Sequence, residues 1–327
     1  MAKEILRMED VTKIYDNGFV ANKNVTFWLH ESEILALVGE NGAGKTTLMK
    51  VLFGLETPQT GKVYMDGKEV KILNTLDAIE KGIGMVHQHF MLIPSLTVAE
   101  NVVLGVEPMK NGLFDFKKAV EMTEEVAKKY NFNIDPMARV SDLSVGQMQK
   151  IEIMKVLIKG AKIIIMDEPT AVLTPQETEE LFEQLILLRN SGHSIIFISH
   201  KLEEVKRICT RVTVLRHGYC LGSYDLKDMS EADISRLMVG RDVVLKIEKE
   251  DPTVGKTVLK IRNLVKNSAS GKRVLDDVSF DIHEGEVIGI AGVEGNGQSA
   301  LSDVLAGMES FSSGTVELNG HDIKPRV

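Results

Sequence analysis

The feature that most restricts the fold of this chain is a glycine-rich run, GENGAGKT, at residues 39–46. It matches the pattern GxxxxGK[ST] in full, follows the apolar run SEILALVG and precedes KTTLMKVLFGL, which is typical of a helix. A strand, this loop and a helix in that order predict a phosphate-binding loop, whose backbone N–H groups and helix N-terminus surround the phosphates. A flexible glycine-rich turn, the alternative, does not account for the strand and helix on either side. The residues expected to contact nucleotide are Gly39, Glu40, Asn41, Gly42, Ala43, Gly44, Lys45, Thr46 and Thr47.

Within this loop the side chains of Lys45 and Thr46 have separate predicted roles. Lys45 is expected to reach the β- and γ-phosphates, and the Thr46 hydroxyl to bind Mg²⁺. The sequence therefore predicts ATP and Mg²⁺ as the ligands of this site.

Three short isoleucine-rich runs, SEILALVG, AKIIIMDE and SIIFISH, predict strands that are buried on both faces. A helix is expected between the last two, because Thr174 can cap it, Pro175 suits its first turn and Glu177 completes a capping box. The apolar side chains that share one face of this helix are Leu181, Leu185 and Leu188. Strands that alternate with helices predict an α/β fold with a mainly parallel sheet.

Two carboxylates follow the second of these strands, in IIIMDE at residues 163–168. Ligands of open α/β sheets bind at the carboxyl ends of the strands. Asp167 is therefore expected to bind Mg²⁺, through water, and Glu168 to act as the general base on the attacking water.

The chain also repeats itself. VTFWLHESEILALVGENGAGKTTL from Val25 resembles VSFDIHEGEVIGIAGVEGNGQSAL from Val278, and the same separation relates Gly61 to Gly314. Two copies of one unit are predicted: the first at residues 1–240, a linker at 241–256, and a shorter second copy at 257–327. Either the chain is a fragment of a longer protein or the rest of the second copy was lost.

In the second copy Gln298 replaces the lysine of the loop. A neutral amide can still donate a hydrogen bond to a phosphate, so nucleotide binding there stays open. Efficient hydrolysis is not expected, because the developing negative charge loses one positive partner.

Bulk composition restricts the partners. Hydrophobic residues make up 43% and charged residues 26% of the 327 residues, as in ordinary globular proteins. The net charge of −8 argues against a nucleic-acid-binding face, which usually has a basic surplus. No apolar run approaches the roughly 18 residues that would cross a bilayer, so any membrane role is expected to involve a separate partner.

Further motifs carry a resemblance to a known family. The run LSVGQ at residues 143–147 resembles the LSGGQ signature of ATP-binding cassette (ABC) proteins, with Val145 in place of one glycine. Gln88 is similar to the family's Q-loop glutamine and His200 to its switch histidine. The resemblance covers essentially the whole chain and implies a P-loop NTPase fold with an antiparallel β subdomain and a helical subdomain at about residues 90–160.

The resemblance also implies site residues. Gln88 would be a Mg²⁺ ligand and, with His200, part of the catalytic site. Tyr15 would stack on adenine; a packed aromatic at a strand end is the alternative, and for His200 the alternative is a structural residue. Cassettes of this family pair head to tail, within a full chain or as a homodimer. That pairing would bring three signature residues to a facing nucleotide: Ser144, Gly146 and Gln147.

Three further residues receive no catalytic or metal-binding role: Thr174, His87 and His89. Thr174 stands near the place where family members often have an aspartate that couples two ATP sites, so coupling between sites is expected to differ, and no catalytic role is assigned to Thr174. His87 and His89 flank Gln88 without a third metal ligand nearby in the sequence, and we interpret both as non-metal residues.

LSVGQ, EPTAVLTPQE and AGVEGNGQS together resemble the ATPases of importers for simple sugars and nucleosides, with the nucleoside branch slightly favoured. This resemblance implies ATP hydrolysis at the cytoplasmic face of the cell membrane, by a peripheral subunit that binds integral-membrane permeases and serves a solute-binding protein indirectly. The alternatives are a soluble ABC protein that acts on ribosomes or in DNA repair, and a regulatory nucleotide-binding module. A short linker argues against the first, and an intact Lys45, Glu168 and His200 against the second.

Overall fold

A computed structural model describes residues 3–240, 254–268, 271–292 and 295–323. The chain divides into two compact units, Met1–Leu245 and Lys246–Val327, which are treated separately below. The predicted linker at 241–256 lies mostly outside the described residues.

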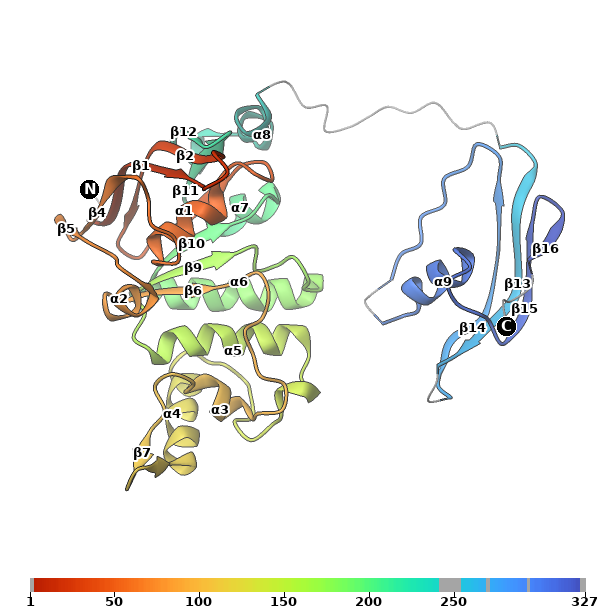
Figure 1. Cartoon of the computed structure of the whole chain (residues 1–327), viewed down its shortest axis with the longest axis horizontal. Helices are drawn as coiled ribbons and strands as arrows, with labels where there is room; N and C mark the ends of the chain where they lie inside the picture. Colours follow the sequence, from red (N-terminus) through yellow and green to blue (C-terminus); the bar gives the residue numbers. More distant parts are fainter. Residues whose placement is uncertain (1–2, 241–253, 269–270, 293–294, 324–327) are drawn as a thin grey trace. The chain divides into compact units, whose positions relative to one another are not determined.

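A six-stranded sheet forms the centre of the first unit (Figure 1). Its strands, in spatial order, are β12 (Tyr219–Asp225), β11 (Arg211–Arg216), β3 (Ile34–Val38), β10 (Ser194–Ile198), β9 (Ile163–Asp167) and β6 (Ile83–Val86). All neighbours are parallel except β12, which is antiparallel to β11. Every residue of β3, β9 and β10 is buried, which confirms the three strands predicted from their apolar runs.

A second, antiparallel sheet has the order β2-β1-β4-β5. It is made of β1 (Glu4–Ile14), β2 (Val20–His30), β4 (Thr60–Met65) and β5 (Lys68–Val70). Helix α1 (Lys45–Leu52) contributes Leu48 and Met49 to one core that also contains Phe27 of β2 and Leu37 of β3. This core therefore joins the antiparallel sheet to one face of the central sheet.

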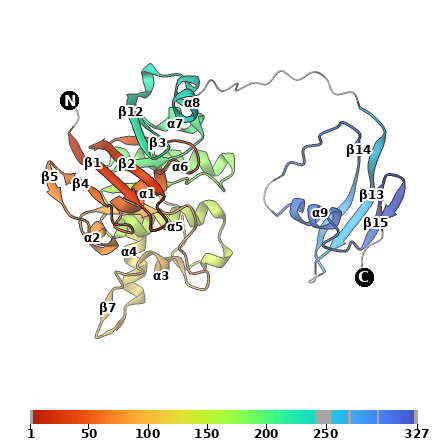
Figure 2. The same ribbon diagram turned by 45° about the horizontal axis from the view of Figure 1, so that its top comes forward.

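The other face of the central sheet packs against α5 (Val145–Ile158) and α6 (Pro175–Asn190) in a second core. Helices α3 (Val98–Val102) and α4 (Phe116–Lys129) contact α5 and each other (Figure 2). The remaining elements of this unit are α2 (Thr75–Glu80), the strand pair β7 (Met109–Lys110) and β8 (Leu113–Phe114), α7 (Leu202–Ile208), α8 (Glu231–Val239) and two 3-10 turns at Val140–Asp142 and Leu226–Asp228.

Helix α6 begins as the sequence predicts. Thr174 is its N-cap, Pro175 is its first residue, and the side chains of Thr174 and Glu177 form the reciprocal bonds of a capping box. The three leucines expected on one face are all buried: Leu181, Leu185 and Leu188.

The second unit repeats part of the first. Its antiparallel sheet, β14 (Arg273–His283), β13 (Thr257–Asn267), β15 (Ser313–Leu318) and β16 (His321–Ile323), has the same topology as β2-β1-β4-β5, and α9 (Gln298–Leu305) corresponds to α1. Both helices follow a glycine in the left-handed region, Gly44 at φ 96° and Gly297 at φ 98°. The predicted internal repeat is confirmed for these elements.

The run of the second unit that corresponds to β3 has a different conformation. The run that matches β3 forms no strand, and Val287 is 95% exposed. In the first unit β3 lies between β10 and β11, both of which come later in the chain. Among the described residues of the second unit, no strand pairs with residues 287–290.

Candidate nucleotide-binding site

The glycine-rich loop connects the end of β3 to the start of α1. Gly42 and Gly44 have positive φ angles, 80° and 96°. A Cβ atom on Gly44 would lie 2.3 Å from the carbonyl oxygen of Ala21, so no other residue fits there without a backbone shift. The side chain of Asn22 donates a hydrogen bond to the Gly44 carbonyl at 3.1 Å. The antiparallel sheet thus fixes the loop.

Lys45 lies across this loop and is only 6% exposed. Its ammonium donates to the backbone carbonyls of Gly39 at 2.7 Å and Glu40 at 3.0 Å. Burial lowers the pKa of Lys45, and the nearby carboxylates of Glu168 and Asp167 oppose that shift. An ammonium has three N–H donors, so one of them remains for a phosphate.

A cavity of about 320 Å³ opens beside the loop. The structure brings together at this cavity several residues predicted from sequence: Asn41, Gly42, Ala43, Gly44, Lys45, Thr46, Thr47, Gln88 and Glu168. Two further lining residues, Phe19 and Ala21, were not predicted. Phe19 lies in the turn before β2 and is 55% exposed. The only signal for Phe19 in the sequence is an aromatic residue directly after a turn-like run, in DNGF.

The two carboxylates at the end of β9 lie in different surroundings. Asp167 is 4% exposed and accepts a hydrogen bond from the Thr46 hydroxyl at 3.4 Å. Burial raises the pKa of Asp167, while the bond from Thr46 acts in the opposite direction. Glu168 has a positive φ of 48°, and its carboxylate is 3.2 Å from Nδ1 of His200, which follows β10. His200 is therefore placed to contact a group bound at Glu168.

Three oxygen donors suit a hard cation: the hydroxyl of Thr46, the carboxylate of Asp167 and the side-chain amide of Gln88. Mg²⁺ prefers oxygen ligands and is usually held by one or two carboxylates together with substrate phosphates. Thr46 and Asp167 already lie within 3.4 Å of each other, and Gln88 lines the same cavity as Thr46. These residues fit Mg²⁺, which would neutralise phosphate charge there.

Tyr15 lies next to the loop but is not among the residues that line the cavity. Its hydroxyl is 3.2 Å from the hydroxyl of Thr47, and the ammonium of Lys13 is 5.2 Å from the centre of its ring. Both the stacking role and the packing alternative for Tyr15 stay open.

The signature residues lie away from this cavity, at the start of α5. Ser144 is the N-cap and Gln147 completes a capping box. The carboxylate of Glu177 accepts hydrogen bonds from the backbone N–H of Gly146 and from the Ser144 hydroxyl. Burial would raise the pKa of Glu177, but its hydrogen bonds from Thr174, Gly146 and Ser144 outweigh this and lower it. In this chain Ser144, Gly146 and Gln147 are therefore not brought to the site around Lys45.

The second unit has its own cavity at the degenerate loop. The described residues that line it include Gly292, Gly295, Gly297, Gln298 and Ser299. Val293 and Glu294, also part of the predicted loop, lie outside the described residues.

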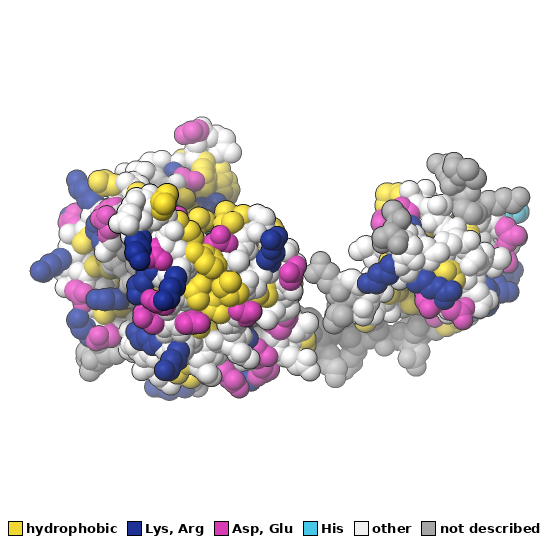
Figure 3. Space-filling view, turned by 90° about the horizontal axis from the view of Figure 1, so that it is seen from below, with side chains coloured by type: hydrophobic (Ala, Val, Ile, Leu, Met, Phe, Trp, Pro, Cys, Tyr) yellow, Lys and Arg dark blue, Asp and Glu magenta, His cyan; other side chains and the backbone are white. Residues whose placement is uncertain are grey.

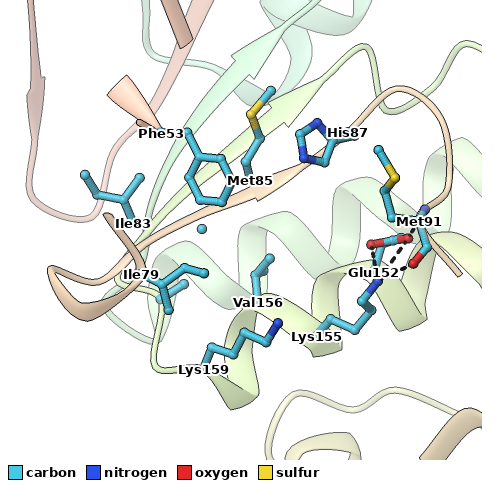
Figure 4. A pocket seen from close by; sticks show the side chains of 12 residues that line it. Phe53, Ile79, Ile83, Met85, His87, Met91, Glu152, Lys155, Val156 and Lys159 are labelled. Atoms are coloured by element: carbon cyan, nitrogen blue, oxygen red, sulfur yellow. Dashed lines mark hydrogen bonds and ion pairs between the residues drawn. The ribbon is translucent and has the colours of Figure 1, made fainter. Parts of the chain in front are cut away.

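A separate, more apolar cavity of about 170 Å³ lies beside His87 (Figure 4). Phe53, Met85 and Val156 form much of its wall. The His87 ring meets the Phe53 ring edge to face, with 6.2 Å between the ring centres, and burial lowers the pKa of His87. His87 lines this cavity, and the next residue, Gln88, lines the loop cavity.

A phosphate-binding loop, a mainly parallel sheet and paired carboxylates at a strand end define a nucleotide-binding α/β protein of the phosphate-loop class. A family model described as "ABC transporter" matches residues 22–171 and 275–327, which is more than half of the chain. The chain belongs to the ABC transporter family.

Several proteins of known function are similar to this chain. It is 45% identical over 320 residues to Guanosine import ATP-binding protein NupO of Bacillus subtilis, an alignment that covers 98% of this chain and 62% of that protein. It is 43% identical over 346 residues to a glucose import ATP-binding protein of Haloferax volcanii, with coverage of 97% and 63%. It is 43% identical over 324 residues to Nucleoside import ATP-binding protein NupA of Lactococcus lactis, with coverage of 99% and 64%. The chain thus spans less than two thirds of the length of these relatives.

Solved structures share the fold. A nucleotide-free ATP-binding cassette from an ABC transporter aligns with a TM-score of 0.62 and 23% identity, over 76% of this chain and all of that one. The dimeric structure of the bacterial ABC transporter cassette MJ0796 aligns with a TM-score of 0.59 and 27% identity, over 69% of this chain and all of that one. A post-hydrolysis state of the same cassette, bound to ADP and Pi, aligns equally well. These likenesses confirm the predicted cassette fold.

Proposed function

We propose that the chain binds and hydrolyses Mg-ATP and that it is the ATP-binding component of an importer for nucleosides or sugars. The observation that carries this proposal is the single cavity that joins the phosphate loop, Lys45 and Glu168. A loop alone would bind phosphate, whereas a loop with an ordered carboxylate opposite it can also activate water.

The assignments of Lys45 and His200 rest on contacts. That of Glu168 rests on its place at the cavity, and that of Tyr15 on the family resemblance. Lys45 is held by two loop carbonyls with one N–H remaining, which suits a β- or γ-phosphate oxygen. Glu168 is proposed as the general base that accepts a proton from the attacking water. His200 contacts the Glu168 carboxylate through Nδ1, and is proposed to orient that carboxylate and to sense the γ-phosphate. Tyr15 is proposed to stack on adenine.

The signature is proposed to act on a facing cassette. Ser144 and Gly146 lie at the start of α5, outside the cavity of their own unit. A head-to-tail pair would bring them to a nucleotide bound elsewhere, and the related cassette MJ0796 has been solved as a dimer. Two chains can pair in this way, or the first unit can pair with a second cassette.

Transport is proposed because the similar proteins above are import ATP-binding proteins. The proposed partner is an integral-membrane permease, with this chain at its cytoplasmic face. No helix within the described ranges is long and apolar enough to span a bilayer. Figure 3 shows hydrophobic side chains exposed together on one face of the first unit, among charged residues of both signs. Exposed apolar groups of this kind mark protein contacts. Identities of 45% and 43% to guanosine and glucose importers leave the solute open.

Two measurements test the proposal. ATP hydrolysis by the purified chain should depend on Mg²⁺ and should be lost in Glu168→Gln. Tagged chain expressed in a bacterium that encodes its permease should purify from detergent-solubilised membranes together with that permease. Co-sedimentation with ribosomes in place of a permease would favour the soluble alternative.

A further inference from the structure

One carboxylate joins the start of α6 to the start of α5. The Oε2 atom of Glu177 accepts bonds from the backbone N–H of Thr174 at 3.0 Å and from its hydroxyl at 3.1 Å. The Oε1 atom accepts bonds from the backbone N–H of Gly146 at 3.0 Å and from the Ser144 hydroxyl at 3.3 Å. One oxygen therefore completes the cap of α6, and the other binds the signature segment.

The fit at Gly146 is close. Gly146 is buried, and a Cβ atom placed on it would lie 2.6 Å from Oε1 of Glu177. The Glu177 side chain thus covers the backbone of Gly146, while Ser144 is exposed. A phosphate that approached the Gly146 N–H would meet the carboxylate first.

The chemistry of these donors is that of an anion site. A hydroxyl and a backbone N–H point at one oxygen, at the N-terminus of a helix of 14 residues whose dipole favours negative charge. The anion that occupies this site is the carboxylate of Glu177, a residue of the same chain.

We propose that Glu177 is an internal competitor of nucleotide: its carboxylate holds the Ser144 and Gly146 donors until the γ-phosphate of a facing cassette replaces it. This inference rests on the proposed function, in which those donors complete a facing ATP site. The free energy that these donors contribute to pairing is then only the difference between their bonds to the γ-phosphate and their bonds to the Glu177 carboxylate. ADP presents no γ-phosphate to displace the carboxylate, so the exchange favours pairing around ATP.

The variant that separates this role from helix capping is Glu177→Gln. Glutamine also serves at the third position of a capping box, has nearly the same size, and lacks the charge. Glu180→Gln is the matched control. Glu180 lies on the same helix and also bonds to α5, through Lys150 at 2.6 Å, without contacting residues 144–147.

The experiment measures self-association of the full chain in a Glu168→Gln background, which should keep ATP bound because the proposed base is removed. Sedimentation velocity is measured over a range of chain concentrations, with Mg-ATP or Mg-ADP. It gives the midpoint, which is the chain concentration at which half of the chains are paired. Adding Glu177→Gln should lower the midpoint with ATP about fivefold, because charged acceptors hold donors roughly twice as strongly as neutral ones. It should also reduce the preference for ATP over ADP, and Glu180→Gln should stay within about twofold of the parent.

Three results would overturn the inference. An unchanged or higher midpoint in Glu177→Gln would show that the carboxylate positions the signature or only caps α6. An equal shift in Glu180→Gln would show a general effect of charge. If neither the parent nor the variants paired in the presence of ATP, no γ-phosphate would replace the Glu177 carboxylate, and the inference would fail. ATP binding, measured separately by titration against Lys45→Met, tests the proposed function itself: binding without pairing ends only this inference, whereas loss of specific binding ends both.

Discussion

Replacement of Lys45 by methionine should sharply weaken ATP binding while the fold survives. The Lys45 ammonium donates two hydrogen bonds, to the carbonyls of Gly39 and Glu40 at 2.7 and 3.0 Å, and its third N–H remains for a phosphate. Truncation of a close, desolvated charge pair typically costs about 2–5 kcal/mol. This corresponds to roughly thirtyfold to several thousandfold in Kd. The carboxylates of Asp167 and Glu168 would remain beside the phosphates, which places the effect in the upper part of that range.

Stability should change much less than binding. Methionine fills a similar volume and removes a buried charge, and net loss of a hydrogen bond costs about 1 kcal/mol. In a unit of this size, each kcal/mol lost from the free energy of unfolding lowers the melting temperature by about 2–4 °C.

Isothermal titration calorimetry with Mg-ATP measures the Kd, and circular dichroism checks the fold. Lys50→Met is the matched control, because Lys50 lies on the same helix, at its last turn, and does not line the cavity. Binding by a folded Lys45→Met variant within twofold of the parent, or an equal loss in Lys50→Met, would refute the assignment.

Further predictions concern the strand end and the loop. Glu168→Gln should bind ATP normally but turn it over at least about 10²-fold more slowly in a phosphate-release assay; parental turnover would place the base elsewhere. Asp167→Asn should raise the melting temperature of the nucleotide-free chain at pH 7, because burial raises the pKa of Asp167 and so the fold disfavours its charge. This advantage should shrink as the pH falls and the parental carboxyl becomes protonated, while Mg²⁺-dependent ATP binding is lost at all pH values; a lower melting temperature would contradict the argument. Gly44→Ala should destabilise the first unit and abolish ATP binding, since its Cβ would lie 2.3 Å from the Ala21 carbonyl; thermal melting and titration both check this.

Features that depend on neighbours in sequence were predictable. The buried strands β3, β9 and β10 follow from apolar runs, and the start of α6 follows from Thr174, Pro175 and Glu177 within a single turn. The loop and Glu168, which follows β9, could be placed at one cavity because parallel strands bring their carboxyl ends to one sheet edge. The catalytic roles of these residues stay predictions.

Contacts between distant segments were not predictable. Glu177 was identified as the third residue of a capping box, and that role is confirmed. Its second set of bonds, to Ser144 and Gly146, joins helices whose first turns are 31 residues apart along the chain. No local pattern encodes such a bond. Phe19 was not predictable for the same reason. It lies in the turn before β2, and the packing of the antiparallel sheet on α1 brings this turn to the cavity.

The second unit shows how far a sequence pattern determines structure without its partners. Its loop keeps the local geometry, because a left-handed Gly297 and the helix after it depend on a few successive residues. Its antiparallel sheet also forms, since β13, β14, β15 and β16 lie close together in sequence and share a core. The run that resembles β3 is also mainly apolar, yet Val287 and Ile290 are 95% and 54% exposed. In the first unit β3 gains its backbone hydrogen bonds from β10 and β11, which begin more than 150 residues further along the chain. In the first unit the apolar run of β3 is therefore a buried strand between β10 and β11, whereas among the described residues of the second unit no strand pairs with the corresponding run. This difference separates a phosphate loop that follows a paired strand from one that has only its local conformation.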